Sequence, residues 1–219
     1  MPTWGFYGRA DELAELGRMV RAQRWFFCRL EGRRRIGETT LLSQLAKSIP
    51  ELESRLIYMQ VPDSDERDVA VTLRRAIEDC DHELPRALAG SVVDFATMAH
   101  AIGQLCQAGF FVVLDEFQYF TRAKLRAFNS FLQAQVDELR NLALPHGGLF
   151  VLGSLQSEMN ALLDDQAAPL YGRTFIVGWF STAPRPAGLA LGAVLPKGSA
   201  SHVQRRLPAV SSSARGVSK

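Results

Sequence analysis

Apolar residues recur along the first 180 positions in two alternating patterns, short continuous runs and longer stretches with helical spacing. A continuous apolar run is typical of a parallel strand that is buried on both faces. Spacings of three and four residues, as in Leu13, Leu16, Met19 and Val20, are typical of an amphipathic helix. The runs predict strands at residues 24–30, 55–61, 110–114, 149–152 and 174–179. The spacings predict helices at residues 10–23, 39–48, 66–80, 94–107, 124–141 and 155–163, with a less regular segment at 81–92.

Strands and helices therefore alternate, and this order predicts an α/β fold with a parallel sheet and right-handed crossovers. The pattern ends near residue 180. Residues 181–219 are rich in Ser, Ala, Pro, Gly and Arg, and they contain no Asp or Glu. We therefore expect one folded domain at residues 1–180 and a low-complexity, disordered basic tail at residues 181–219.

The positive charge of the chain belongs to this tail. The whole sequence has 25 Lys and Arg against 23 Asp and Glu, a net charge of +2. Six of the basic residues lie in 181–219, which leaves 19 against 23 and a net charge of −4 for residues 1–180. Because the domain is mildly acidic, its charge does not predict a nucleic-acid-binding face, and nucleic acid is the least favoured partner.

The remaining composition favours a cytoplasmic protein without membrane contact. No apolar run approaches the roughly 18–20 residues of a membrane span, and the N-terminus lacks the charged and apolar segments of a signal peptide. Cys28, Cys80 and Cys106 are widely spaced in apolar contexts, so we interpret them as reduced core thiols. The four histidines are scattered and show no metal-ligand spacing.

A glycine-framed loop follows the first predicted strand. Its sequence, GRRRIGET at residues 32–39, matches the phosphate-binding pattern G-x-x-x-x-G-K-[ST] except that Glu38 replaces the lysine. Gly32 and Gly37 allow the tight turn and the close approach of backbone to phosphate. The loop N–H groups and the positive end of the next helix favour an anion, and the Thr39 hydroxyl would bind a magnesium ion. Taken alone, the string is equally compatible with a basic surface turn.

Glu38 predicts weak nucleotide binding and hydrolysis near zero. A carboxylate about 4 Å from a phosphate costs on the order of 4 kcal/mol per unit charge at an effective dielectric near 20. The attraction of the usual lysine is lost as well. Arg33, Arg34 and Arg35 would offset part of this, although side chains in such loops usually point outward.

Two acids, Asp115 and Glu116, directly follow the most apolar predicted strand, which ends at Leu114. A buried parallel strand places such acids at the carboxyl edge of the sheet, where ligands bind in open parallel sheets. There Asp115 can hold a magnesium ion through water, and Glu116 can orient and deprotonate an attacking water molecule. Ser154, after the fourth strand, either belongs to a turn that ends the strand, which the pair Gly153-Ser154 favours by itself, or lies between the two sites and senses the terminal phosphate. Arg173, before the fifth strand, either reaches a phosphate in its own or a neighbouring subunit or is salt-bridged at the surface.

Together these segments resemble the prokaryotic AAA-type ATPases known as the archaeal ATPase family, which are related to the STAND NTPases. The resemblance runs from about residue 4 to residue 180. It rests on these segments: Phe6-Tyr7-Gly8-Arg9 with Glu12, Leu13 and Leu16, the loop with Ile36 and Thr39-Thr40-Leu41-Leu42, Leu114-Asp115-Glu116-Phe117-Gln118, Gly153-Ser154, and Pro169-Leu170-Tyr171-Gly172-Arg173.

The resemblance implies a three-layer P-loop NTPase core with a five-stranded parallel sheet of order 5-1-4-3-2, and ATP and Mg2+ as cofactors. It implies that the loop, including Ile36 and Thr40, binds the nucleotide and that Gly8 and Arg9 lie by the base. It places Thr39 and Asp115 on the metal, Glu116 as catalytic base and Ser154 as phosphate sensor. The family continues into a helical lid and a C-terminal domain, and residues 181–219 match neither, as in a truncated or frame-shifted product.

Two functions remain open at this point. The first is an ATP-binding P-loop ATPase domain whose hydrolysis is impaired by Glu38. The second is a non-catalytic interaction module that keeps the fold without turning nucleotide over, and that binds a partner protein or associates with itself. Wild-type affinity for magnesium-ATP separates the two.

Overall fold

The computed structural model describes residues 10–32, 38–142 and 147–179, and the side chains of residues 31–40, 178 and 179 lie outside this description. The strands in this part of the chain are β1 (Phe26–Gly32), β2 (Leu56–Gln60), β3 (Phe111–Asp115), β4 (Gly148–Leu152) and β5 (Phe175–Trp179). The helices are α1 (Ala10–Arg21), α2 (Glu38–Ser48), α3 (Pro50–Glu53), α4 (Glu66–Glu78), α5 (Glu83–Ala89), α6 (Phe95–Gln107), the 3-10 helix η1 (Phe117–Thr121), α7 (Phe128–Asn141) and α8 (Gln156–Leu163). The predicted tail, residues 181–219, lies outside the described residues.

The strands form one parallel sheet of order β2-β3-β4-β1-β5. Read from its other edge, this is the predicted order 5-1-4-3-2, so the fold prediction is confirmed. β1 pairs on both sides, and its Cys28 lies opposite Phe150 of β4 and opposite Phe175 of the edge strand β5. β3 and β4 are buried along nearly their whole length, as expected for strands covered on both faces.

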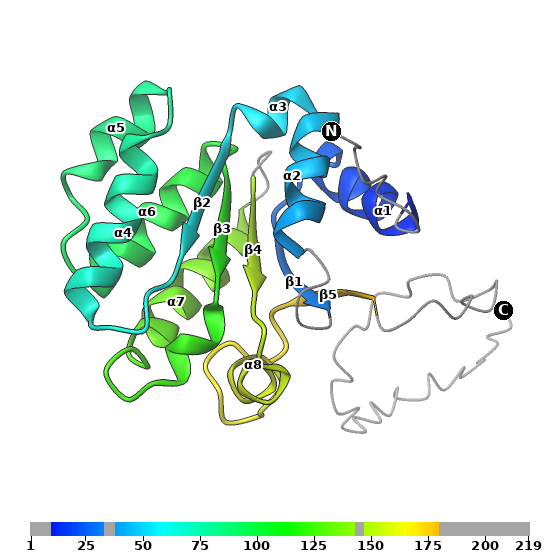
Figure 1. Cartoon of the computed structure of the whole chain (residues 1–219). Coiled ribbons are helices and arrows are strands. Elements are labelled where there is room, and N and C mark those ends of the chain that lie inside the picture. The colour runs from blue at the N-terminus through cyan, green and yellow to red at the C-terminus, as the bar shows by residue number, and fades with distance from the viewer. Residues whose placement is uncertain (1–9, 33–37, 143–146, 180–219) are drawn as a thin grey trace, which may run out of the picture. The chain divides into compact units, whose positions relative to one another are not determined.

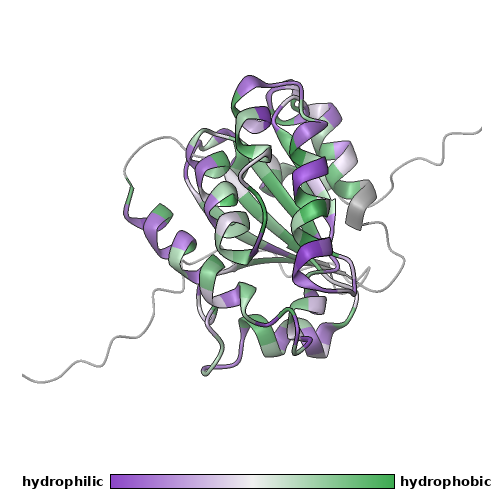
Figure 2. Ribbon diagram, turned by 90° about the vertical axis from the view of Figure 1, so that its left-hand side faces the viewer, coloured by the Kyte–Doolittle hydropathy of each residue, from purple (hydrophilic) through white to green (hydrophobic). Residues whose placement is uncertain are grey.

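Helices cover both faces of the sheet and produce three layers (Figure 1). One core cluster joins alternate strand residues, among them Phe26, Val113 and Phe150, to buried positions of α1 and α2. The other joins the intervening strand residues to α4, α6, α7 and α8. Figure 2 shows the consequence, with hydrophobic strands in the interior and the hydrophilic sides of the helices turned outward.

Three of the local differences from the sequence prediction lie in α-helices. The segment predicted as irregular contains α5, a short helix that accommodates Pro85 because its first turn needs no N–H donor there. The helix predicted from residue 124 begins only at Phe128. It follows successive turns, one of which is closed by a hydrogen bond from the Arg126 N–H to the Arg122 carbonyl. The third is α3, a single turn opened by Pro50 directly after α2.

Within the described residues, no helix combines the length and the apolar character needed to cross a membrane.

Candidate functional site at the carboxyl edge of the sheet

The carboxyl ends of β1, β4 and β3 lie at one edge of the sheet, because these strands are parallel neighbours. β1 ends at Gly32 and β3 ends at Asp115, and β4 lies between them and ends at Leu152. The start of the predicted phosphate loop and the predicted acids therefore share one edge and are separated by a single strand. Ligands bind at this edge in open parallel sheets.

The loop stands between a strand and a helix, as the phosphate-binding pattern requires. α2 begins at Glu38, so Thr39 and Thr40 lie in its first turn, where backbone N–H groups carry the positive end of the helix dipole. Several predicted contacts lie outside the described residues and stay predictions. These concern residues Gly8, Arg9, Arg33, Arg34, Arg35, Ile36 and Gly37, and the side chains of Glu38, Thr39 and Thr40.

Asp115 is held by its neighbours at the tip of β3. Its Oδ2 accepts a hydrogen bond of 2.6 Å from the hydroxyl of Tyr58, on the adjacent strand β2, and its Oδ1 accepts one of 2.7 Å from the backbone N–H of Glu116. The carboxylate is half-buried. It therefore has a defined orientation at the edge of the sheet, and its oxygens belong to the ligand class that Mg2+ prefers.

Glu116 adopts a left-handed backbone conformation, with φ 55° and ψ 36°. For a residue other than glycine this conformation is uncommon and costs of order 1–3 kcal/mol, and residues with such strain cluster at functional sites. It turns the chain from β3 into η1 directly after Asp115. The two consecutive acids thus end up with different hydrogen-bond partners.

The carboxylate of Glu116 contacts Ser154, which follows the end of β4. The Ser154 hydroxyl donates a hydrogen bond of 3.2 Å to Oε2 of Glu116, and the same oxygen accepts a short hydrogen bond from Nε2 of Gln118. Nε2 of Gln118 also lies 3.5 Å from the Ser154 hydroxyl oxygen. The structure therefore brings together two of the predicted site residues, Glu116 and Ser154, and adds a third polar group.

Gly153 is required by this arrangement. A Cβ atom at this position would lie 2.5 Å from Oε1 of Gln118 and 2.8 Å from Cγ of Met159, closer than real Cβ contacts. The glycine in the Gly153-Ser154 pair thus makes room for the Gln118 side chain.

Arg173 contacts helix α7. Its Nε and Nη2 donate hydrogen bonds of 2.7 and 2.8 Å to the two oxygens of Asp137, and its Nη1 donates one of 3.1 Å to the Tyr171 carbonyl. This pair lowers the pKa of Asp137 and raises the pKa of Arg173, chiefly through the hydrogen bonds between them. None of these contacts involves Asp115, Glu116 or Ser154, and the geometry is that of the salt-bridged alternative.

Sequence reasoning assigned no role to Tyr58, Gln118 or Arg29. Tyr58 lies in an ordinary strand pattern. Gln118 belongs to a segment that resembles the ATPase family, but that resemblance assigns it no role. Arg29 interrupts an apolar run, which is a signal that a charged side chain is buried. It is fully buried, and it donates hydrogen bonds of 2.8 Å to Asp164 and 2.6 Å to Asn160 at the end of α8. This contact ties β1 to the helix that follows Ser154.

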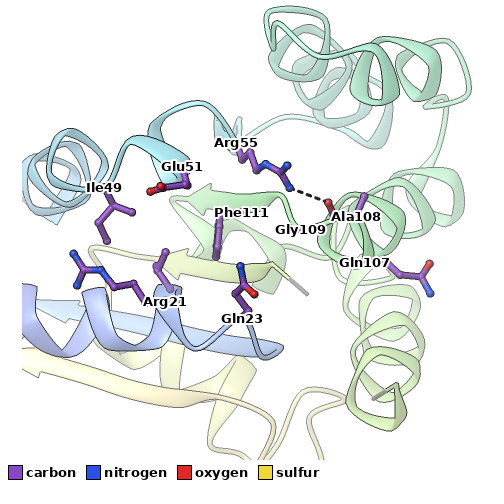
Figure 3. A pocket seen from close by; sticks show the side chains of 10 residues that line it. Arg21, Gln23, Ile49, Glu51, Arg55, Gln107, Ala108, Gly109 and Phe111 are labelled. Carbon is purple, nitrogen blue, oxygen red and sulfur yellow. Dashed lines mark hydrogen bonds between the residues drawn. The ribbon is translucent and has the colours of Figure 1, made fainter. Parts of the chain in front are cut away.

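A cavity of about 560 Å3 lies at the opposite, amino edge of the sheet. It is lined by residues that precede β1, β2 and β3, including Gln23 and Arg55, and by Phe111, the first residue of β3 (Figure 3). Arg55 turns to the Ala108 carbonyl, 3.4 Å away, at the end of α6. Because Phe111 and Asp115 are the two ends of β3, this cavity is separate from the candidate site.

The cysteines in the structure are reduced and buried, as predicted. Burial raises the pKa of the Cys28 and Cys106 thiols far above the ordinary value, and it raises that of Cys80 as well. In the described part of the chain, no group of three or more His, Cys, Asp or Glu side chains is arranged to hold a metal ion.

Several solved structures share this fold. The Walker-type ATPase paby2304 of Pyrococcus abyssi aligns with a TM-score of 0.55 and 19% identity, over 81% of this chain and 55% of that one. The ORC2 protein of Aeropyrum pernix, solved in ADPNP–ADP complexes, aligns with a TM-score of 0.56 and 15% identity, over 80% of this chain and 48% of that one. This chain thus spans about half the length of each.

No protein-family model matches the sequence, and no curated protein matches it. At the identities above, the structural similarity shows the fold alone. The chain therefore has an α/β fold like that of these two proteins.

Proposed function

We propose that the domain binds ATP with Mg2+ at the carboxyl edge of the sheet. The observation that carries this proposal is the shared edge at which β1, the strand before the glycine-framed loop, and β3, the strand that ends in Asp115, both end, with β4 and Ser154 between them. A triphosphate that extends from the start of α2 toward β3 would pass over the end of β4. The similarity in fold to a Walker-type ATPase and to a protein solved with ADPNP and ADP supports the proposal.

Each residue at this edge has chemistry that suits a step of phosphoryl transfer. The Thr39 hydroxyl and the Asp115 carboxylate would hold Mg2+, which neutralises charge on the transferred phosphate. Glu116 would accept a proton from the attacking water. The Ser154 hydroxyl has one proton, which it donates to Glu116 in the structure, and it would turn that proton to the terminal phosphate to sense it.

Glu38 makes this a weak site. In the sequence pattern Glu38 replaces the lysine whose positive charge would meet the outer phosphates, and a carboxylate about 4 Å from a phosphate is repelled by on the order of 4 kcal/mol at an effective dielectric near 20. We expect weak binding and very slow hydrolysis in the natural chain.

The same substitution favours a second candidate, a non-catalytic interaction module. In that case the domain keeps the fold to present a surface to a partner protein or to another copy of itself. An Arg173 acting on the nucleotide of a neighbouring subunit would first have to leave Asp137, so its present contacts do not favour that role.

The test is a calorimetric titration of magnesium-ATP into the natural chain and into Glu38→Lys, with Glu38→Gln as the matched control. If solvent leaves only a third of the repulsion, its removal still corresponds to about tenfold in affinity, because 1.4 kcal/mol is a factor of ten. We therefore expect about tenfold tighter binding for Glu38→Gln, and tighter binding still for Glu38→Lys.

The outcomes separate the two candidates. Micromolar binding by the natural chain supports the nucleotide site, and no binding up to millimolar concentrations supports the interaction module. If neither substitution raises the affinity, the loop is not a phosphate site and the proposal is wrong.

A further inference from the structure

Gln118 is almost completely buried beside the candidate site, with an exposed fraction of 1%. Its side chain lies in η1 and spans the gap between the ends of β3 and β4. A carboxylate only accepts hydrogen bonds, so the amide nitrogen of Gln118 must face Glu116. The orientation of the amide is therefore decided by chemistry.

The oxygen atom of the same amide, unlike its nitrogen, makes no hydrogen bond in the described part of the chain. Oε1 of Gln118 is buried and has no hydrogen-bond partner among the described residues. An unsatisfied buried acceptor costs stability, and native proteins contain few of them. An apolar side chain of similar size would fill this space without that cost. Packing of the fold thus does not explain a glutamine at this position. The hydrogen bond from its Nε2 to Glu116 does.

We infer that Gln118 is a positioning residue that sets the place of the Glu116 carboxylate. Two donors, Gln118 Nε2 and the Ser154 hydroxyl, converge on the single oxygen Oε2 of Glu116. They determine which oxygen is engaged and leave Oε1 of Glu116 as the one to meet a water molecule. The left-handed backbone of Glu116 and the missing Cβ of Gly153 make this contact possible.

The inference rests on the proposed function, because a positioned base matters only if a nucleotide is turned over. Two readouts are therefore needed, so that failure of the inference can be distinguished from failure of the proposed function. The first reports the contact itself and needs no nucleotide. The second reports turnover.

The first readout is the solvent exchange of the Gln118 side-chain amide, followed by NMR in the natural chain. A buried and hydrogen-bonded amide proton should exchange at least about tenfold more slowly than that of the exposed Gln156. Glu116→Ala should bring the rate back toward that of Gln156. Equal rates in the natural chain would overturn the inference, whatever the nucleotide titrations show.

The second readout uses Gln118→Leu in the Glu38→Lys chain. We expect the turnover number to fall by about tenfold, the lower end of the effect seen when the hydrogen-bond partner of a metal ligand is removed, while the affinity for magnesium-ATP changes less than about twofold. The thermal midpoint should change little, because removal of the unsatisfied acceptor offsets the loss of the hydrogen bond to Glu116. Gln104→Leu, a half-buried position in α6, is the matched control and should change neither turnover nor affinity.

A merely structural role would give the opposite pattern, with a lowered thermal midpoint and with turnover and affinity lost together. That result, or unchanged turnover in Gln118→Leu, overturns the inference. If the Glu38→Lys chain binds no ATP, the proposed binding function is wrong. If it binds ATP without turning it over, the proposed catalytic role of the site is wrong. The amide exchange then decides alone whether Gln118 positions Glu116.

Discussion

The ion pair between Arg173 and Asp137 decides whether Arg173 serves the fold or the nucleotide. We predict that Arg173→Ala and Asp137→Ala each destabilise the domain and that their effects are coupled. The two charged groups share parallel hydrogen bonds of 2.7 and 2.8 Å, the forked geometry that makes arginine–carboxylate pairs strong.

The expected coupling follows from charge and exposure. Two unit charges about 4 Å apart attract by about 4 kcal/mol at an effective dielectric of 20. Solvent reduces this value, since 42% of the Asp137 side chain and 20% of the Arg173 side chain are exposed. We therefore expect a coupling free energy of about 1 kcal/mol, at the upper end for partly exposed pairs.

The coupling should also depend on pH. Hydrogen bonds from Arg173 lower the pKa of Asp137 in the folded state, whereas the unfolded carboxyl titrates near its usual value of about 3.9. The unfolded state therefore binds more protons near that pH, and stability rises with pH there. The contribution is complete above the unfolded pKa, and it is lost as the pH falls through the lower folded pKa.

The assay is urea unfolding of the natural chain, both single variants and the double variant, at pH 7 and again at pH 3. A coupling near zero at pH 7 would refute the reasoning. So would an Arg173→Ala variant that keeps full stability but loses the ATP turnover of the Glu38→Lys chain, because Arg173 would then act on the nucleotide. Arg140 contacts the Arg173 carbonyl at 2.7 Å, and Arg140→Ala controls for the loss of a neighbouring charge.

Two further predictions concern the carboxyl edge. Tyr58→Phe removes the 2.6 Å hydrogen bond to Asp115. In the Glu38→Lys chain it should raise the Mg2+ concentration needed for ATP binding by about tenfold. Calorimetric titrations at several Mg2+ concentrations measure this shift, and no shift is expected if Asp115 does not bind the metal. Gly153→Ala forces its Cβ against Gln118 and Met159, and it should cost about 1–3 kcal/mol in urea unfolding. Gly90→Ala, where a Cβ meets nothing within 4 Å, should change stability by less than about 0.5 kcal/mol, and equal effects of the two substitutions would contradict the packing argument.

The amino-acid sequence by itself determined the alternation of strands and helices. Local patterns carry this information, because a strand buried on both faces must be apolar throughout and a covering helix must be apolar on one side. The positions of the loop and of Asp115 relative to strand ends are local as well. Together with a parallel sheet, they imply that the strand before the loop and the strand that ends in Asp115 share one edge, and β1 and β3 do end at the same edge.

Only the tertiary structure decided which side chains meet at and around that edge. Gln118 and Ser154 are 36 positions apart in the chain, as are Arg173 and Asp137, and Arg29 is separated from Asp164 by 135. Such contacts depend on strand register and on the turn that each chain segment takes after its strand. A spacing pattern describes one element at a time, so it carries no information about pairs that form only when two distant elements pack together.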